Sequence, residues 1–184
     1  MKALTLEALL SLFPGSDTQL PPHQLGLEPP YYEVIAGSAM PEPYRGLLVH
    51  DQHMTVTVEA FHGGPVDVQV AQERQDEHLY ARKISLTHQA TGRTVLFGIV
   101  RIDLRLTSPE VRAAILARQT PLGRILIEHD VLRRIEPTSY LKITPGPAQL
   151  AWFGLSEPAP LYGRLAFIHC DGEPAIELLE VVSP

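Results

Sequence analysis

Alternation of apolar and polar residues is the strongest structural signal in this sequence, and it dominates the chain after residue 53. Successive side chains of a β-strand point to opposite faces, so runs with a period of two, separated by turn residues, predict strands joined as hairpins. We expect hairpins over residues 54–73 with a turn at 63–65, over residues 78–104 with a turn at 88–93, and over residues 161–184 with a turn at Asp171–Gly172. Consecutive hairpins predict an antiparallel sheet.

The other expected elements complete an α+β fold. Helical periodicity predicts a short amphipathic helix over residues 4–13 and two further helices over residues 108–119 and 125–136. Shorter strands are expected at 31–37 and 138–143, which gives a single antiparallel sheet of about six strands with helices on one face. The length favours one domain, residues 1–184, with an N-terminal helix and Pro-rich arm (1–44, with the loop at 14–30) and a core (45–184).

Composition excludes several classes of function. A net charge of -6 and a pI near 5.7, without a run of Lys or Arg, argue against nucleic acid as a partner. The apolar N-terminal stretch is interrupted by Glu7 and ends at Pro14–Gly15, so no membrane span or signal peptide is expected. The single cysteine, Cys170, fits a cytoplasmic location, and the spacing of the eight histidines predicts no metal site.

Two charged residues stand on apolar strand faces. Arg82 is in phase with Ile84 and Leu86, whereas Lys83 points the other way. In the last strand both faces are apolar, so alternation alone does not decide whether Glu177 or Glu180 points inward. A charge removed from water needs a partner, and an inward Arg and Glu therefore predict either a buried ion pair or a polar cavity.

The segment "TPLGR", residues 120–124, is expected to begin a helix. Thr120 and Pro121 repeat the arrangement of an N-cap followed by Pro at the first helical position, which makes Leu122 and Gly123 the second and third helical residues. Their N–H groups have no intrahelical acceptor and suit a carboxylate. On this reading Gly123 leaves room for a ligand; the alternative is that it only lets two helices turn sharply.

Four motifs in order resemble the chorismate pyruvate-lyase family. These are "HMT" (53–55), "YAR" (80–82), "TPLGR" (120–124) and "GEPAIELLEVVSP" (172–184), and the resemblance extends from about residue 45 to the C-terminus. It implies one antiparallel sheet with helical flaps over an internal site, and a conversion of chorismate to 4-hydroxybenzoate and pyruvate without a cofactor. The flap candidates are the helix pair around Thr120 and the Pro-rich segment before Met54.

The resemblance also implies the site residues. The family's ligand contacts fall on Met54, on Arg82, on the backbone of Leu122 and on Glu180, which settles the choice between the two glutamates. From the residues alone, Met54 is more simply a core side chain. The last strand has one residue more than the family between Gly172 and Glu180, so we expect either a bulge or a shifted turn that keeps Glu180 inward.

The expected chemistry needs two groups. Arg82 binds a carboxylate, and Glu180 hydrogen-bonds the ring hydroxyl or transfers a proton, while the N–H groups of Leu122 and Gly123 bind a second carboxylate or the product. Two alternatives remain open. The chain could be a non-catalytic binding protein for an aromatic carboxylate, or a lyase of the same fold that gives a different hydroxybenzoate.

Overall fold

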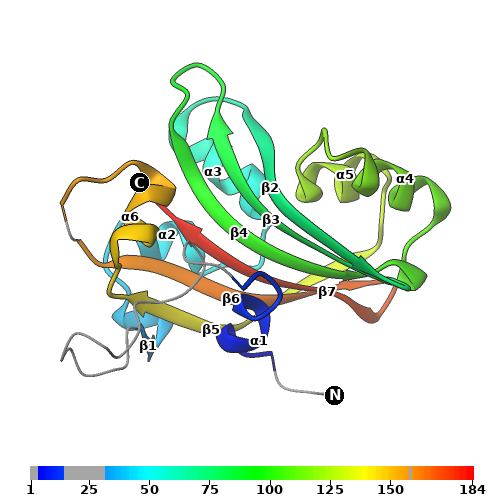
Figure 1. The fold of residues 1–184 in the computed structure, drawn as a ribbon, viewed down its shortest axis with the longest axis horizontal. Helices are drawn as coiled ribbons and strands as arrows, with labels where there is room; N and C mark the ends of the chain where they lie inside the picture. The colour runs from blue at the N-terminus through cyan, green and yellow to red at the C-terminus, as the bar shows by residue number, and fades with distance from the viewer. Residues whose placement is uncertain (1–3, 15–31, 158) are drawn as a thin grey trace.

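The computed structural model describes residues 4–14, 32–157 and 159–184, and these form an α+β fold built on one antiparallel sheet (Figure 1). Seven strands, rather than about six, pair in the order β1-β5-β6-β7-β4-β3-β2 among the described residues. Their bounds are β1 Tyr32–Ile35, β2 Val66–Asp76, β3 Leu79–His88, β4 Thr94–Asp103, β5 Arg133–Ile143, β6 Leu161–Cys170 and β7 Glu173–Val182. The predicted class is confirmed. The predicted loop at 14–30 lies almost wholly outside the described residues.

Helices cover both faces of the sheet, not one face as predicted. On one face lie α2 (Tyr44–Leu48), α3 (Met54–His62), α4 (Pro109–Ala117) and α5 (Leu122–Glu128). On the other face lie α1 (Leu6–Leu10) and α6 (Pro147–Phe153), where Trp152 stacks on Phe97 of β4. Two short 3₁₀ helices, η2 (Gly37–Ala39) and η3 (Leu104–Leu106), complete the described elements. Apolar side chains fill the space between the sheet and each layer of helices.

The strand predicted at residues 54–62 is wrong, because these residues form α3. Nine alternating residues are too few to separate the two periods, and Met54, Thr55 and Val58 also share one side of a helix, which is the buried side. Packing of that side on the sheet overrides the strand preference of the β-branched residues. Gly63 ends the helix with a φ of 74°, in the left-handed region that glycine adopts readily.

The helix predicted over residues 125–136 is shorter than expected. It ends at Glu128, and β5 begins at Arg133 and absorbs the strand predicted at 138–143. Asp130 lies between them with a φ of 49°, a conformation that a helix cannot continue through. The spacing of Ile127, Val131 and Ile135 imitates a helical face across the turn, which explains the wrong prediction.

The hairpins β3–β4 and β6–β7 form as predicted, the latter with its turn at Asp171–Gly172. The register of β6 and β7 shifts between Ile168, which pairs with Ile176, and His169, which pairs with Pro174. Ala175 of β7 lies between these two pairs and has no partner residue in the register with β6. The expected bulge is therefore present, and beyond it Glu180 faces the same side as Leu178.

Candidate functional site

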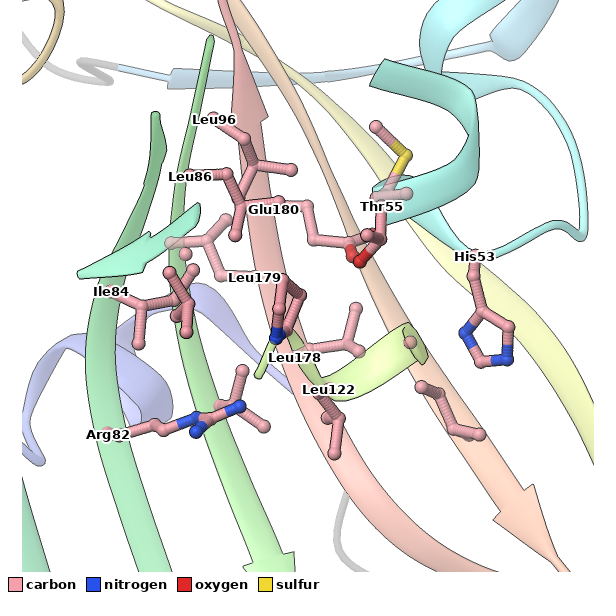
Figure 2. Close-up of a pocket in the computed structure, with 17 residues that line it drawn as sticks. His53, Thr55, Arg82, Ile84, Leu86, Leu96, Leu122, Leu178, Leu179 and Glu180 are labelled. Carbon is pink, nitrogen blue, oxygen red and sulfur yellow. The ribbon is translucent and has the colours of Figure 1, made fainter. Parts of the chain in front are cut away.

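A small cavity lies between the sheet and the starts of α3 and α5 (Figure 2). Its walls are mainly apolar side chains of β3, β4 and β7, and its volume is about 50 Å³. It is lined by all five residues predicted for the site: Met54, Arg82, Leu122, Gly123 and Glu180. The structure therefore brings together residues that are up to 126 positions apart in the sequence.

Arg82 is the unusual residue of this cavity. Its side chain is 1% exposed, and its Nε and Nη1 atoms have no hydrogen-bond partner among the described residues. The nearby carboxylate of Glu73 is already engaged, since it accepts hydrogen bonds from the hydroxyl of Tyr80 at 2.8 Å and from Arg118 at 2.6 Å. Burial lowers the pKa of Arg82, yet a guanidinium stays charged at neutral pH. A buried cation with free donors is a site that attracts an anion.

Glu180 is 13% exposed and is paired, not free. It accepts a hydrogen bond from Nε of Arg164 on β6 at 2.7 Å. Burial raises the pKa of Glu180, and the ion pair with Arg164 opposes that rise. Glu177, the rival candidate in the sequence, pairs with Arg101 on the opposite face of the sheet. Of the two glutamates, Glu180 is the one that lines the cavity.

Strand pairing fixes the spacing of Arg82 and Glu180. Arg82 pairs with Val100 of β4, which pairs with Leu178 of β7, and Glu180 lies two residues further along that strand. With about 4.8 Å between strands and about 3.4 Å per residue, their Cα atoms are about 12 Å apart on a diagonal. Gly98 lies between them and contributes no side chain. Figure 2 shows the guanidinium of Arg82 reaching across from β3, with Glu180 further along β7.

The start of α5 forms another wall, with a cap that differs from the prediction. Pro121 is the N-cap and no side chain caps the helix, so Leu122 and Gly123 are its first and second residues, not its second and third. A Cβ on Gly123 would lie 3.0 Å from Cβ of His53 and 3.0 Å from Oγ1 of Thr55. Gly123 therefore allows α5 to approach the start of α3 closely. This packing role agrees better with the prediction that Gly123 lets two helices turn sharply than with the prediction that it leaves room for a ligand.

Met54 and His53 line the cavity from α3. Met54 is the first residue of this helix, not part of the predicted strand, and its buried side chain lines the cavity. His53, which the sequence did not single out as a ligand contact, is the N-cap residue and accepts a hydrogen bond from Nε of Arg133 at 2.6 Å. Burial first, then the charges of Arg133 and Arg164, lower the pKa of His53 to about 4. His53 is therefore neutral at neutral pH.

Two ion pairs hold the α4–α5 segment over the cavity. Arg124 of α5 bonds both carboxylate oxygens of Glu59 on α3, at 2.7 and 2.5 Å. Arg118, the C-cap of α4, bonds Glu73 of β2 at 2.6 Å. The cavity holds only a few water molecules at its present volume, so an aromatic acid enters only if these helices move apart.

Neither a metal site nor a membrane span is found in the described part of the chain. No group of three or more His, Cys, Asp or Glu residues is arranged to hold a metal ion there. The helices of these ranges all lack the length and apolar character needed to cross a membrane.

Comparison with known proteins gives the fold but no family assignment. No family model and no curated protein matches the chain. Among solved structures, PhnF from Mycobacterium smegmatis matches with a TM-score of 0.53 and 13% identity, over 71% of this chain and 63% of that one. The ligand-binding domain of a putative GntR-family transcriptional regulator from Bordetella bronchiseptica matches with a TM-score of 0.49 and 11% identity, over 64% and 85% of the two chains. The C-terminal domain of PhnF gives 0.47 and 14%, over 66% and 84%.

The likeness to PhnF from Mycobacterium smegmatis concerns the class of fold. The chain shares an α+β fold with that structure, and here the fold has one antiparallel sheet and an internal cavity under helices. It spans less than two thirds of the PhnF chain that it matches. At 13% identity the likeness concerns the fold, and activity has to be argued from the cavity.

Proposed function

We propose that the protein is a chorismate pyruvate-lyase, which converts chorismate to 4-hydroxybenzoate and pyruvate. The observation that carries this proposal is that one cavity holds both a buried Arg82 with free donors and Glu180. Their Cα atoms lie about 12 Å apart, on strands β3 and β7. One group suits a carboxylate and the other suits a hydroxyl, and these are the polar groups at the two ends of 4-hydroxybenzoate.

Substrate binding starts from Arg82. Its guanidinium donates two hydrogen bonds to a carboxylate, which replaces the water that a buried cation lacks. Leu122 and Gly123 present N–H groups without intrahelical acceptors at the cavity wall, and these take the second carboxylate or the product. Apolar walls from β4 and β7 pack against the ring. Binding requires α3 and α5 to separate and then close again.

The reaction is an elimination that makes the ring aromatic. The bond from ring carbon 3 to the ether oxygen breaks, the ring carbon that bears the hydroxyl loses its proton, and the enolpyruvate gains a proton to become pyruvate. All atoms of chorismate are accounted for in the two products, so no cofactor is needed. Glu180 hydrogen-bonds the ring hydroxyl or accepts the proton, and Arg82 stabilises carboxylate charge.

Release of pyruvate from chorismate, coupled to lactate dehydrogenase, tests the proposal. We expect turnover by the purified chain in the cytoplasmic pH range, loss of turnover in Glu180→Gln, and retention in Glu177→Gln on the opposite face of the same strand. Product identification by mass spectrometry separates 4-hydroxybenzoate from another hydroxybenzoate. No pyruvate from chorismate at any enzyme concentration would remove the lyase proposal.

A second function, binding of an aromatic carboxylate without catalysis, has one observation in its favour. Arg82 is the cation with free donors in the described lining of the cavity, while Glu180 and Arg164 offset each other in charge. A single cation suits a monoanion such as 4-hydroxybenzoate better than a dianion such as chorismate. A rise in melting temperature with 4-hydroxybenzoate, together with no pyruvate release, would select this function.

A further inference from the structure

Arg164 is the most heavily engaged buried side chain behind the cavity. It is 1% exposed and lies on β6, where it is the cross-strand neighbour of Glu180. Its Nε donates to the Glu180 carboxylate at 2.7 Å. The described lining of the cavity does not include Arg164, so its action on a bound molecule passes through other groups.

The rest of the guanidinium holds the segment between α2 and α3. Nη1 donates to the carbonyl oxygens of Leu48 at 3.2 Å and His50 at 2.7 Å, and Nη2 donates to that of Gln52 at 3.1 Å. This segment leads directly into His53, the N-cap of α3, and the first residues of α3 form a wall of the cavity. One side chain therefore ties the carboxylate of Glu180 to the backbone that places this wall.

We propose that Arg164 is a positioning residue, which favours the ionised form of Glu180, orients its carboxylate and at the same time fixes the α3 wall of the cavity. The link to a ligand rests on the proposed function. The coupling between Arg164 and Glu180 does not, because it is a property of the protein without ligand.

The charges around Glu180 make the ionisation part of the proposal specific. Arg164 faces it from β6, His50 and His53 lie near Arg164 in the segment that leads into α3, and Arg82 lies across the cavity on β3. His53 is neutral, and Arg82 lies two strands away from Glu180, so Arg164 is the cation in contact with the carboxylate. Burial raises the pKa of Glu180 even with Arg164 in contact, and without Arg164 nothing in contact would oppose that rise. A protonated Glu180 cannot accept a proton from a substrate.

A titration of Glu180 without ligand tests this coupling. We would follow the side-chain carboxyl carbons of ¹³C-labelled glutamate by NMR, with Glu180 assigned through Glu180→Gln, in the wild type and in Arg164→Met. The midpoint of Glu180 should rise by about one pH unit or more in Arg164→Met. The matched control is Arg101→Met, which breaks the Arg101–Glu177 pair on the opposite face and should leave Glu180 unchanged. An unchanged midpoint in Arg164→Met would overturn the proposal.

Further variants keep the test decisive if Arg164→Met does not fold. Arg164→Lys keeps the charge but not the set of donors, and it should give a smaller rise. The double variant Arg164→Met/Glu180→Gln removes both charges and should be more stable than Arg164→Met. If Arg164 were only a structural residue, Arg164→Lys would lower the melting temperature with no movement of the Glu180 midpoint.

Binding of 4-hydroxybenzoate provides the ligand-linked measurement. In Arg164→Lys, the pH at which affinity changes should follow the shifted midpoint of Glu180. Absence of both binding and pyruvate release in the wild type would defeat the proposed function, while the ligand-free titration would still decide the role of Arg164.

Discussion

Gly98 on β4 is the cross-strand neighbour of Glu180 on β7. The glutamate thus has a cation on one side, from Arg164 on β6, and a missing side chain on the other. A Cβ on Gly98 would lie 3.2 Å from the carbonyl oxygen of Leu179 and 3.4 Å from Cδ1 of Ile84. The space beside Glu180 therefore exists because residue 98 is glycine.

Substitution of Gly98 should close this space. We expect Gly98→Val to lower affinity for 4-hydroxybenzoate by about tenfold or more, or about 1.4 kcal/mol, because the branched side chain occupies the cavity. Isothermal titration calorimetry measures the change. Gly46→Ala, on the exposed side of α2, is a control that should leave affinity unaltered. Wild-type affinity in Gly98→Val would show that the ligand binds elsewhere.

Replacing Arg82 should abolish ligand binding and stabilise the folded protein. Arg82→Met keeps most of the side-chain volume and removes a buried charge with free donors, so we expect a gain of about 1–3 kcal/mol in the free energy of unfolding together with loss of 4-hydroxybenzoate binding. Urea unfolding and calorimetry on the same samples measure both. Arg105→Met, at an exposed ion pair, should change stability by less than about 0.5 kcal/mol. A destabilised Arg82→Met would indicate that the contacts of Arg82 with Tyr80 and Glu73 outweigh the cost of its unpaired Nε and Nη1 donors.

Gly123 and Leu122 should respond in different ways. Gly123→Val forces the α5 start away from His53 and Thr55, so it should remove most activity. Leu122→Ala deletes a buried side chain at a cost of about 2–3 kcal/mol, but it keeps the N–H group and should retain more activity. Pyruvate release at a temperature where both variants are folded compares them. The reverse order of activity loss would contradict the close-packing role of Gly123.

His53 should make stability depend on pH between about 4 and 6.5. Its pKa in the folded protein, about 4, lies below the ordinary value of 6.5, so the unfolded chain binds more protons in this window. Stability should therefore rise with pH through it, by about 3 kcal/mol at most. Urea unfolding at a series of pH values should show a smaller slope in His53→Gln than in the wild type. His129→Gln, at an exposed position, should keep the wild-type slope.

Several features of the site could be predicted because they depend on strand phase. Arg82 stands out among apolar neighbours in the sequence, and the sheet places it where the phase requires. The same test would have found Arg164, which is in phase with Tyr162, Ala166 and Ile168 and has no polar neighbour on that face. The choice of Glu180 over Glu177 needed the family resemblance, since the alternation of that strand is the same on both faces.

Other features depend on tertiary packing and left no signal. The residues of α3 alternate like a strand, and only the sheet beneath them selects the helix. His53 lies in a polar segment whose composition gives no hint that Arg133, eighty residues later, donates a hydrogen bond to it. The cap of α5 could not be predicted either. Thr120 has the right chemistry for an N-cap, but Pro121 occupies that position.

The place of β7 in the sheet constrains how the protein is made. It is the last strand in the sequence but the central one in the sheet, between β6 and β4. During synthesis the strands β1-β5-β6 and β4-β3-β2 can pair within themselves, yet each set keeps an open edge until residues 173–182 leave the ribosome. Glu180 lies on that final strand. Nascent chains that stall before it would leave the facing edges of β6 and β4 unpaired and would lack the β7 wall of the cavity, so the binding site forms only when residues 173–182 join the two sets of strands.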